Sequence, residues 1–279
     1  MRIDAHQHFW TIEWPFRHGW LDAPGLETIR RDFLPVDLQS SVAQHRLDGT
    51  VFVQTQHDPA EHEWVLGLAE SHPWIKGVVG WVDLDAPDVG KQLESARRNP
   101  TFVGIRHLLQ DDPDGGWLIR PGTRRGFKAL ERLGLTFDLL IRPRHLPYVP
   151  GLADDFPRLK FVIDHCAKPD IRGGGLKEWL DPLRACGRRP NVWCKLSGLV
   201  TEADPANWLP EHLAPFVKAA LQAFGPRRLM WGSDWPVCLL ASGYDRWMEA
   251  AGELLKESSV ADRAWIFGDT AAEFYGLTP

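Results

Sequence analysis

The hydrophobic residues of this chain fall into eight short runs, rich in β-branched side chains and bounded by turn-forming residues. Runs of this length and composition are typical of buried β-strands. They predict strands at residues 2–6, 50–56, 77–83, 102–108, 135–141, 160–166, 192–197 and 228–234. Most of the runs are almost continuously apolar, which favours strands covered on both faces.

Stretches with a helical spacing of apolar residues separate most of these strands, most clearly at residues 60–71, 124–133 and 209–224. Strands that alternate with helices pair in parallel through right-handed crossovers. Eight such units in 279 residues predict a (β/α)8 barrel that occupies residues 1–279 as a single domain. An open, doubly wound sheet is the rival architecture. It normally has a glycine-rich phosphate loop after its first strand, where this chain has His6-Gln7-His8.

Several segments differ from the repeating units. Residues 9–46 are long for one crossover, so we expect them to cover the mouth of the barrel. Residues 113–116 and 172–175 are rich in glycine and are predicted to be loop tips. Residues 262–277 predict a closing helical region, in which Asp269 or Thr270 would cap the final helix.

Composition and charge exclude several classes of protein. Hydrophobic residues make up 44% of the chain and charged residues 25%, as in ordinary folded proteins. The net charge is -5 and there is no basic stripe, so we expect no nucleic-acid partner. Without an apolar leader or a run of about 18 apolar residues, we expect no membrane association and a cytoplasmic location. The four cysteines lack CxxC spacing and are predicted to be buried thiols, with a nucleophilic Cys166 as the minor alternative.

Polar residues crowd the carboxyl ends of the predicted strands, where barrel enzymes carry their active sites. Each has a structural explanation of its own, such as an ion pair between Asp138 and Lys195. Burying so many charges at one end is nevertheless costly unless they are paired or bind a ligand, so the group predicts a functional site. Its members are His6, His8, Gln54, Gln56, His57, Arg106, His107, Asp138, Asp164, His165, Lys195, Ser233 and Asp234.

The pair His6 and His8 suggests a metal site. Residues two apart in a strand share a face, with Cα atoms about 6.5–7 Å apart. Two neutral imidazoles at that spacing can converge on one divalent ion. Two ordinary histidines near a terminus are the simpler alternative.

Two motifs lie near the ends of the chain, Asp-Ala-His-Gln-His-Phe-Trp at residues 4–10 and Trp-Gly-Ser-Asp-Trp-Pro at residues 231–236. Both resemble motifs of the amidohydrolase superfamily. Residues 104–107, 164–169 and 194–202 are similar to the sugar-lactonase branch, which includes L-fuconolactonases and L-rhamnonolactonases. The resemblance runs from residue 2 to about residue 277. It implies a distorted (β/α)8 barrel that hydrolyses a cyclic ester, with a small sugar lactone as partner and no indicated oligomeric state.

The resemblance also bears on the cofactor. Binuclear members of the superfamily carry a lysine, usually carbamylated, on the fourth strand, whereas this chain has Arg106 and His107 there. One divalent ion, zinc or else manganese, is therefore expected, with His6, His8, His165 and Asp234 as its candidate ligands. Metal-free catalysis is the alternative, since some members of this branch work without a metal.

Lactone hydrolysis needs a positioned water, a base, and positive charge near the carbonyl oxygen. We predict Asp234 and His165 as catalytic residues, with Asp234 as the general base. The predicted substrate-binding residues are Arg106, His107, Lys195 and Trp235. Specificity is expected to come from the loops around residues 10–20, 57–63, 111–117 and 239–244.

Three other functions stay open at this stage. One is a metal-dependent decarboxylase or hydratase on the same barrel. Another is a lactonase for dicarboxylates such as pyrones or muconolactones, which would need further arginines at the mouth; Arg142, Arg144 and Arg172 are candidates. The third is a non-catalytic sugar-acid or metal-binding protein, which would not require a carboxylate at the end of the last strand.

Overall fold

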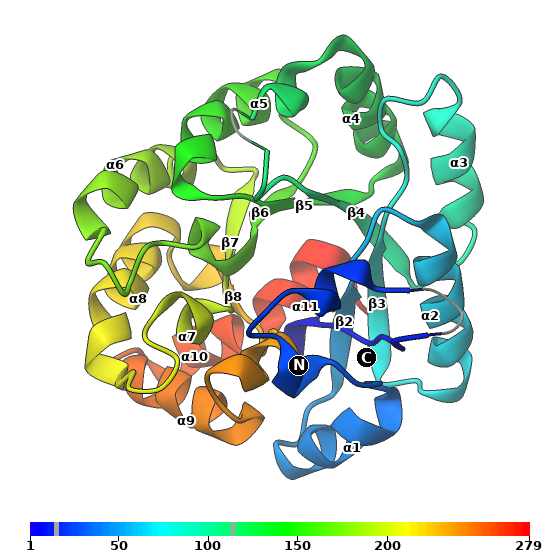
Figure 1. Ribbon diagram of the computed structural model, residues 1–279. Helices are drawn as coiled ribbons and strands as arrows, with labels where there is room; N and C mark the ends of the chain where they lie inside the picture. Colours follow the sequence, from blue (N-terminus) through cyan, green and yellow to red (C-terminus); the bar gives the residue numbers. More distant parts are fainter. Residues whose placement is uncertain (14–16, 113–114) are drawn as a thin grey trace.

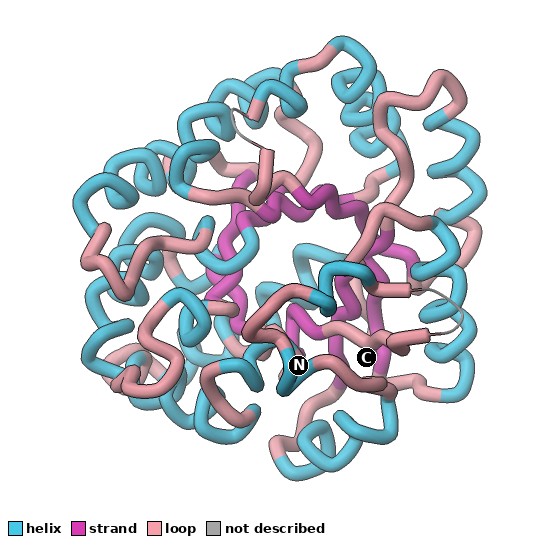
Figure 2. Tube along the Cα trace, in the orientation of Figure 1, coloured by secondary structure: helices cyan, strands magenta, loops and turns pink. Residues whose placement is uncertain are grey.

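The computed structural model describes residues 1–13, 17–112 and 115–279. Its eight parallel strands form one sheet in chain order, seen as a central ring in Figures 1 and 2. They are β1 (Ile3–Gln7), β2 (Gly49–Val53), β3 (Ile75–Gly80), β4 (Phe102–Leu108), β5 (Thr136–Leu140), β6 (Phe161–Ile163), β7 (Val192–Leu196) and β8 (Leu229–Trp231). All eight predicted strands are present, and the distorted (β/α)8 barrel is confirmed.

Helices surround this ring (Figure 1). The α-helices are α1 (Pro35–Gln44), α2 (Pro59–Ser71), α3 (Val89–Ala96), α4 (Pro121–Leu133), α5 (Val149–Asp155), α6 (Leu176–Gly187), α7 (Leu199–Glu202), α8 (Pro210–Phe224), α9 (Tyr244–Leu254), α10 (Val260–Ile266) and α11 (Asp269–Tyr275). The short 3-10 helices are η1 (Gly19–Asp22), η2 (Glu27–Ile29), η3 (Gly116–Ile119), η4 (Pro143–Tyr148), η5 (Asp164–Ala167), η6 (Pro226–Arg228) and η7 (Val237–Leu240). In the described chain, no helix combines the length and the apolar character that a bilayer span requires.

The three predicted crossover helices are confirmed as α2, α4 and α8. Each begins with a proline, whose fixed φ suits the first helical position and whose missing N–H costs nothing there. At the start of α2, the Asp58 carboxylate also accepts a hydrogen bond from the backbone N–H of Ala60. At the end of α4, Gly134 adopts the left-handed conformation common after helices.

Apolar side chains and α11 close the amino-terminal end of the barrel. The strands contribute Ile3, Ala5, Val51, Val53, Val79, Val103, Val162 and Met230, and α11 contributes Ala271, Phe274 and Tyr275. The predicted cap of this helix is wrong, because Gly268 occupies the cap position and Asp269 is the first helical residue. A Cβ at position 268 would collide with the carbonyl group of Met1, so the close approach of the N-terminus explains the glycine.

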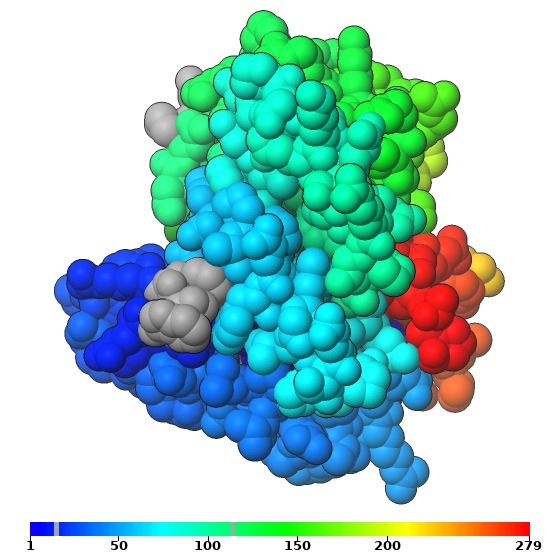
Figure 3. All heavy atoms as spheres, turned by 90° about the vertical axis from the view of Figure 1, so that its right-hand side faces the viewer, coloured from blue at the N-terminus to red at the C-terminus, as the bar shows by residue number. Residues whose placement is uncertain are grey.

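The predicted cover over the opposite end is formed by a covering segment before α1, of which residues 9–13 and 17–34 are described. Trp10 and Phe33 exchange two backbone hydrogen bonds and are both buried, which folds the segment back on itself. The segment and α11 lie at opposite ends of the molecule, blue and red in Figure 3. Residues 35–44 form the crossover helix α1 instead of covering the mouth. Of the predicted loop tips, 172–175 is a turn before α6, and residues 113 and 114 lie outside the described residues.

The barrel closes where the first strand meets the last. Gln7 and Trp235 form a parallel bridge, and the backbone N–H of Asp234 donates to the carbonyl oxygen of His6 at 2.8 Å. The N–H of His8 donates to the carbonyl oxygen of Trp235 at 2.7 Å. The register of β1 shifts between Asp4 and Gln7, which turns the end of this strand toward the seam.

Candidate active site

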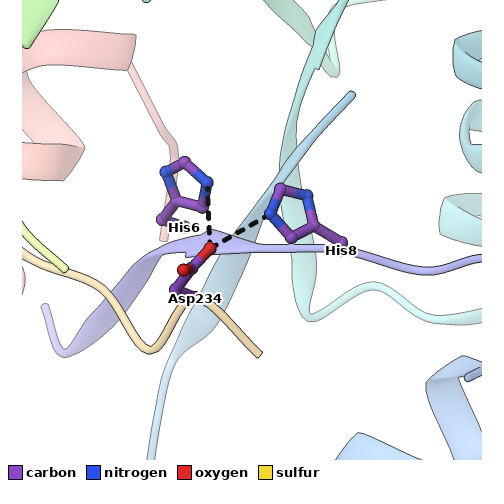
Figure 4. A group of neighbouring side chains, drawn as sticks. All are labelled: His6, His8 and Asp234. Carbon is purple, nitrogen blue, oxygen red and sulfur yellow. Dashed lines mark hydrogen bonds and ion pairs between the residues drawn. The ribbon is translucent and has the colours of Figure 1, made fainter. Parts of the chain in front are cut away.

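The seam between β1 and β8 brings together the residues predicted from the two ends of the chain. Asp234 Oδ1 lies 3.2 Å from His8 Nε2 and 3.6 Å from His6 Nε2, as the dashed lines in Figure 4 show. His165, which follows β6, places its Nε2 3.8 Å from the same oxygen. Three imidazoles therefore surround one carboxylate oxygen, and all four side chains are buried.

The hydrogen bonds of His8 leave a place for a proton or a metal ion at this corner. Its Nδ1 lies 2.6 Å from the carbonyl oxygen of Val53, which can only accept, so Nδ1 carries a proton. In the neutral ring Nε2 is then an acceptor, yet it faces the carboxylate of Asp234. Two acceptors at 3.2 Å repel each other unless a proton or a metal ion lies between them. His6, His8 and Asp234 offer ligand atoms that all lie within 4.8 Å of one another, so the donor set fits one ion.

Cationic side chains already occupy the neighbouring position. His6, Asp164 and His165 form a second group with ligand-like spacing. In that group the Asp164 carboxylate pairs with Arg106 at 3.1 Å and with Lys195 at 3.1 Å. The positive charges of Arg106 and Lys195 thus lie beside this second group of candidate ligands.

A buried network continues below this level into the barrel. Lys195 Nζ lies 2.6 Å from Asp138 Oδ2 and 3.1 Å from His6 Nδ1. The hydroxyl of Tyr275, from α11, donates to the same Asp138 oxygen at 2.7 Å. Burial raises the pKa of Asp138 to about 6, although Lys195 opposes that rise. Burial and the charge of Lys195 hold the pKa of His6 well below its usual range, so its ring is neutral.

The two predicted catalytic residues have complementary electrostatics. Burial by itself would raise the pKa of Asp234, but the imidazoles of His165, His8 and His6 hold it below its usual range. Asp234 is therefore ionised at neutral pH. Burial lowers the pKa of His165 to about 4, so this ring is neutral. Its Nδ1 lies 2.9 Å from the Ser197 hydroxyl, which leaves Nε2 facing Asp234.

Both catalytic candidates lie on backbone in the left-handed region. Residues 165–168 have φ between 51° and 62°, and Asp234 has φ 58°. Residues with a Cβ are disfavoured there by roughly 1–2 kcal/mol each, and such strain concentrates at functional sites. Gly198, at φ 63°, lies against this turn, and a Cβ at that position would approach His165 Nδ1 to 2.6 Å. The glycine therefore leaves room for the imidazole.

A cavity of about 220 Å³ opens above the carboxylate. Its lining residues are His8, Trp20, Thr55, Arg106, Leu108, Gln110, Asp111, Leu140, His165, Lys168, Asp234 and Val237. The volume lies below the ~300–1,000 Å³ typical of drug-sized sites and suits a ligand the size of one sugar ring. Asp234, His165, His8 and Arg106 thus line one cavity, and their roles there stay predictions.

Other predicted site residues lie away from that cavity. His6 and Lys195 are buried beneath it. His107 stacks on Trp117 with ring centroids 3.8 Å apart, and Trp235 packs edge-to-face on Phe33. Neither His107 nor Trp235 lines the cavity, and their substrate-binding role stays a prediction.

Sequence reasoning missed several residues around the site. Gln110 and Lys168 line the cavity from positions just beyond β4 and η5. Asp4 accepts hydrogen bonds from the backbone N–H groups of His6 and Ser233, which holds both sides of the seam. The signals for Asp4 were its place two residues before His6 in the first strand and its membership of the motif at residues 4–10.

The family model described as amidohydrolase matches residues 3–277. The chain therefore belongs to the amidohydrolase family, and the predicted resemblance is confirmed.

Individual relatives place it more narrowly. It is 40% identical over 280 residues to an L-fucono-1,5-lactonase of Burkholderia ambifaria, a match covering 99% of this chain and 96% of the relative. An L-fucono-1,5-lactonase of Burkholderia multivorans is 37% identical over 294 residues, covering 99% and 96%. A crystal structure of an amidohydrolase from Burkholderia multivorans with bound zinc has a TM-score of 0.94 at 36% identity, with 100% of both chains covered.

Proposed function

We propose that this protein is a carboxylic-ester hydrolase that opens a sugar lactone to the free sugar acid. The observation that carries the proposal is the Asp234 carboxylate, held among three imidazoles at the base of a cavity of sugar-ring size. The nearly full-length similarity to two L-fucono-1,5-lactonases supports the same reaction. A binding protein would not require an ionised carboxylate at this position.

In the proposed reaction, Asp234 accepts a proton from a water molecule that attacks the lactone carbonyl carbon. His165 Nε2, which lies 3.8 Å from Asp234 Oδ1, orients this water. The guanidinium of Arg106 supplies positive charge near the carbonyl oxygen as negative charge develops there. When the tetrahedral intermediate collapses, the ring C–O bond breaks and Asp234 returns the proton to the leaving alkoxide. The product acid then ionises, so each turnover releases one proton.

One divalent ion fits the corner formed by His6, His8 and Asp234, with His165 close by. Such an ion would lower the pKa of a bound water and polarise the carbonyl group. Zinc suits imidazole and carboxylate ligands best, with manganese next. Arg106 and the neutral imidazoles keep their roles in a metal-free reaction.

We propose a six-membered aldonolactone of the L-fucono type as substrate, following the names of the two lactonase relatives. A dicarboxylate lactone fits the cavity less well. Arg144 donates to backbone carbonyl groups of Gln110 and Asp112, and Arg172 lies in a separate groove beside Asp204. Among the described residues, Arg106 is the arginine that lines the cavity, and it is already paired with Asp164.

A pH-indicator assay tests the proposal, because lactone opening releases a proton. The purified protein is offered L-fucono-1,5-lactone, L-rhamnono-lactones and a pyrone dicarboxylate lactone. Each reaction is run after chelation, and again after addition of zinc or manganese. We expect the sugar lactones to be opened fastest. We also expect chelation to slow the reaction and zinc to restore it.

The substrate class, the metal ion and the reaction can each be rejected separately. Faster opening of the dicarboxylate lactone would replace the substrate class but keep the hydrolase. An unchanged rate after chelation, with no metal in elemental analysis, would remove the ion and keep the lactonase. Release of carbon dioxide from an aromatic acid, without any lactone opening, would reject the reaction itself.

A further inference from the structure

Three polar atoms of side chains that line the cavity are buried without a hydrogen-bond partner among the described residues. One is Nε of Arg106, whose guanidinium already pairs with Asp164. The other two are Nε1 of Trp20 and Oε1 of Gln110. Both side chains line the cavity that holds Asp234. A donor or acceptor buried without a partner is unfavourable, and such atoms in a binding cavity indicate a ligand that completes them.

The Trp20 indole is fixed by its neighbours. Its ring packs edge-to-face on Trp10, with centroids 5.2 Å apart. Trp10 is itself held, because its Nε1 donates to the carbonyl oxygen of Arg31 at 2.9 Å. The covering segment therefore presents the Trp20 N–H to the cavity.

The Gln110 carboxamide belongs to a loop that is anchored from outside. Arg144 Nη2 donates to the backbone carbonyl oxygens of Gln110 at 2.8 Å and of Asp112 at 2.9 Å. His145 Nε2 also lies 2.8 Å from the Asp112 carbonyl oxygen. The loop after β4 is thus held in a position from which the Gln110 side chain reaches the cavity.

The two atoms differ in kind. An indole N–H can only donate, and a carboxamide oxygen can only accept. A hydroxyl group does both, so it can accept from Trp20 and donate to Gln110. Leu108, Leu140 and Val237 line the same cavity and offer apolar contact to the carbon atoms of a ring. This combination fits a ring that carries hydroxyl groups on part of its edge.

We propose that Trp20 and Gln110 form a hydroxyl-recognition subsite, which makes the enzyme prefer hydroxylated sugar lactones over plain cyclic esters. The inference rests on the proposed lactonase function. The ester group lies against Asp234, His165 and Arg106, and ring hydroxyls lie against Trp20 and Gln110. A site built to hydrogen-bond a hydroxyl discriminates strongly against a substrate that lacks it, because the buried polar groups are left unpaired.

The test compares two six-membered lactones, L-fucono-1,5-lactone and δ-valerolactone, which lacks hydroxyl groups. Trp20→Phe and Gln110→Met each remove one polar atom and keep most of the side-chain volume. We expect each variant to lose about 10- to 100-fold in kcat/KM on the sugar lactone. On δ-valerolactone, kcat/KM should stay at the wild-type value.

Matched controls remove the same groups elsewhere. The controls are Trp265→Phe and Gln92→Met. Trp265 lies on α10 beneath the guanidinium of Arg227, and the side-chain amide of Gln92, on α3, donates a hydrogen bond to Asp88. Neither residue lines the cavity, and both controls should keep the wild-type preference. Thermal melting verifies that each variant is folded. Should Trp20→Phe fail to fold, Gln110→Met carries the test.

The outcomes separate this inference from the proposed function. Parallel losses on both lactones, or no loss on the sugar lactone, would overturn the subsite while the wild-type turnover upholds the lactonase. A wild-type protein that opens neither lactone would overturn both. A loss confined to the sugar lactone supports the subsite.

Discussion

The two ends of this barrel are built from the same strands with opposite chemistry. On β6, Val162 packs in the apolar cluster under α11, and Asp164 follows just past the strand end. On β8, Met230 belongs to the same cluster, whereas Asp234 lies at the cavity. A few residues of each strand therefore separate a part of the molecule that stabilises the fold from a part that carries reactive groups.

The boundary between these parts is the buried network of Lys195, Asp138, Asp164 and Tyr275. Its charges are paired, since an isolated buried charge is strongly unfavourable. Tyr275 belongs to the helix that closes the apolar end, yet its hydroxyl binds a carboxylate of the polar end. We therefore expect substitutions at the mouth to lower activity and substitutions at the base to lower stability. Substitutions in the network between them should lower both.

The largest effect is expected at the mouth. Asp234→Asn removes the general base and should lower kcat by about 10²–10⁴-fold with little change in the melting temperature. The exposed pair of Asp154 with Arg189 provides the control, since Asp154→Asn should leave kcat unchanged. Near-normal turnover by a folded Asp234→Asn protein would reject the assigned base.

The network between the two ends should respond in stability and in activity. Lys195→Met leaves the buried Asp138 without a cation and Asp164 with Arg106 alone, and unfolding by urea should show a loss of about 3–5 kcal/mol. Turnover should fall too, because His6 loses its neighbour. At the exposed pair with Glu253, Lys256→Met should leave the free energy of unfolding nearly unchanged, because water screens this pair. Equal costs for the two lysines would contradict the network.

At the base of the barrel only stability should change. Phe274 is 1% exposed within the apolar cluster, and Phe274→Ala should lower the free energy of unfolding by about 3–5 kcal/mol. The measurement is urea unfolding beside kcat per folded molecule at low temperature, where kcat should be unchanged. A selective fall in kcat would show that α11 acts on the site through Tyr275.

Acid should weaken the fold gradually. Burial lowers the pKa of three histidines, to about 4 for His62 and His165 and to about 3 for His107, so each takes up a proton on unfolding between pH 4 and 6.5. Burial also lowers the pKa of His6, which therefore takes up a proton on unfolding as well. Asp4 and Asp138, whose pKa values burial raises to about 6, release protons on unfolding. Unfolding therefore takes up protons overall, and stability falls by about 1.4 kcal/mol per net proton for each unit of acidification. A melting temperature that is constant from pH 6.5 to 4.5 would contradict this balance.

The sequence predicted the parts of the molecule that depend on local pattern. Apolar runs located all eight strands, and their order placed His6, His8, His165 and Asp234 at one end. Family motifs, not spacing, indicated the reaction. The close approach of Met1 to Gly268, the cap residue of α11, depends on residues far apart in the chain and has no local signal.

The sequence pattern also could not predict which way the side chains near the strand ends point. His107 and Arg106 are neighbours on β4, yet Arg106 faces the cavity and His107 stacks on Trp117. Alternation along a strand separates the two side chains but does not say which faces the cavity. Gln110 lies on a loop whose path is fixed by Arg144, and no periodicity describes such a contact.

The seam has a consequence for how activity arises during synthesis. His8 and Asp234 are 226 positions apart, and the backbone bonds that join them are the ones that close the ring. Contacts so distant in sequence form only when nearly the whole chain is available. A nascent or truncated chain holds the histidines of β1 without their carboxylate. Only molecules with a closed barrel are therefore catalytically active, and partly folded molecules contribute no activity.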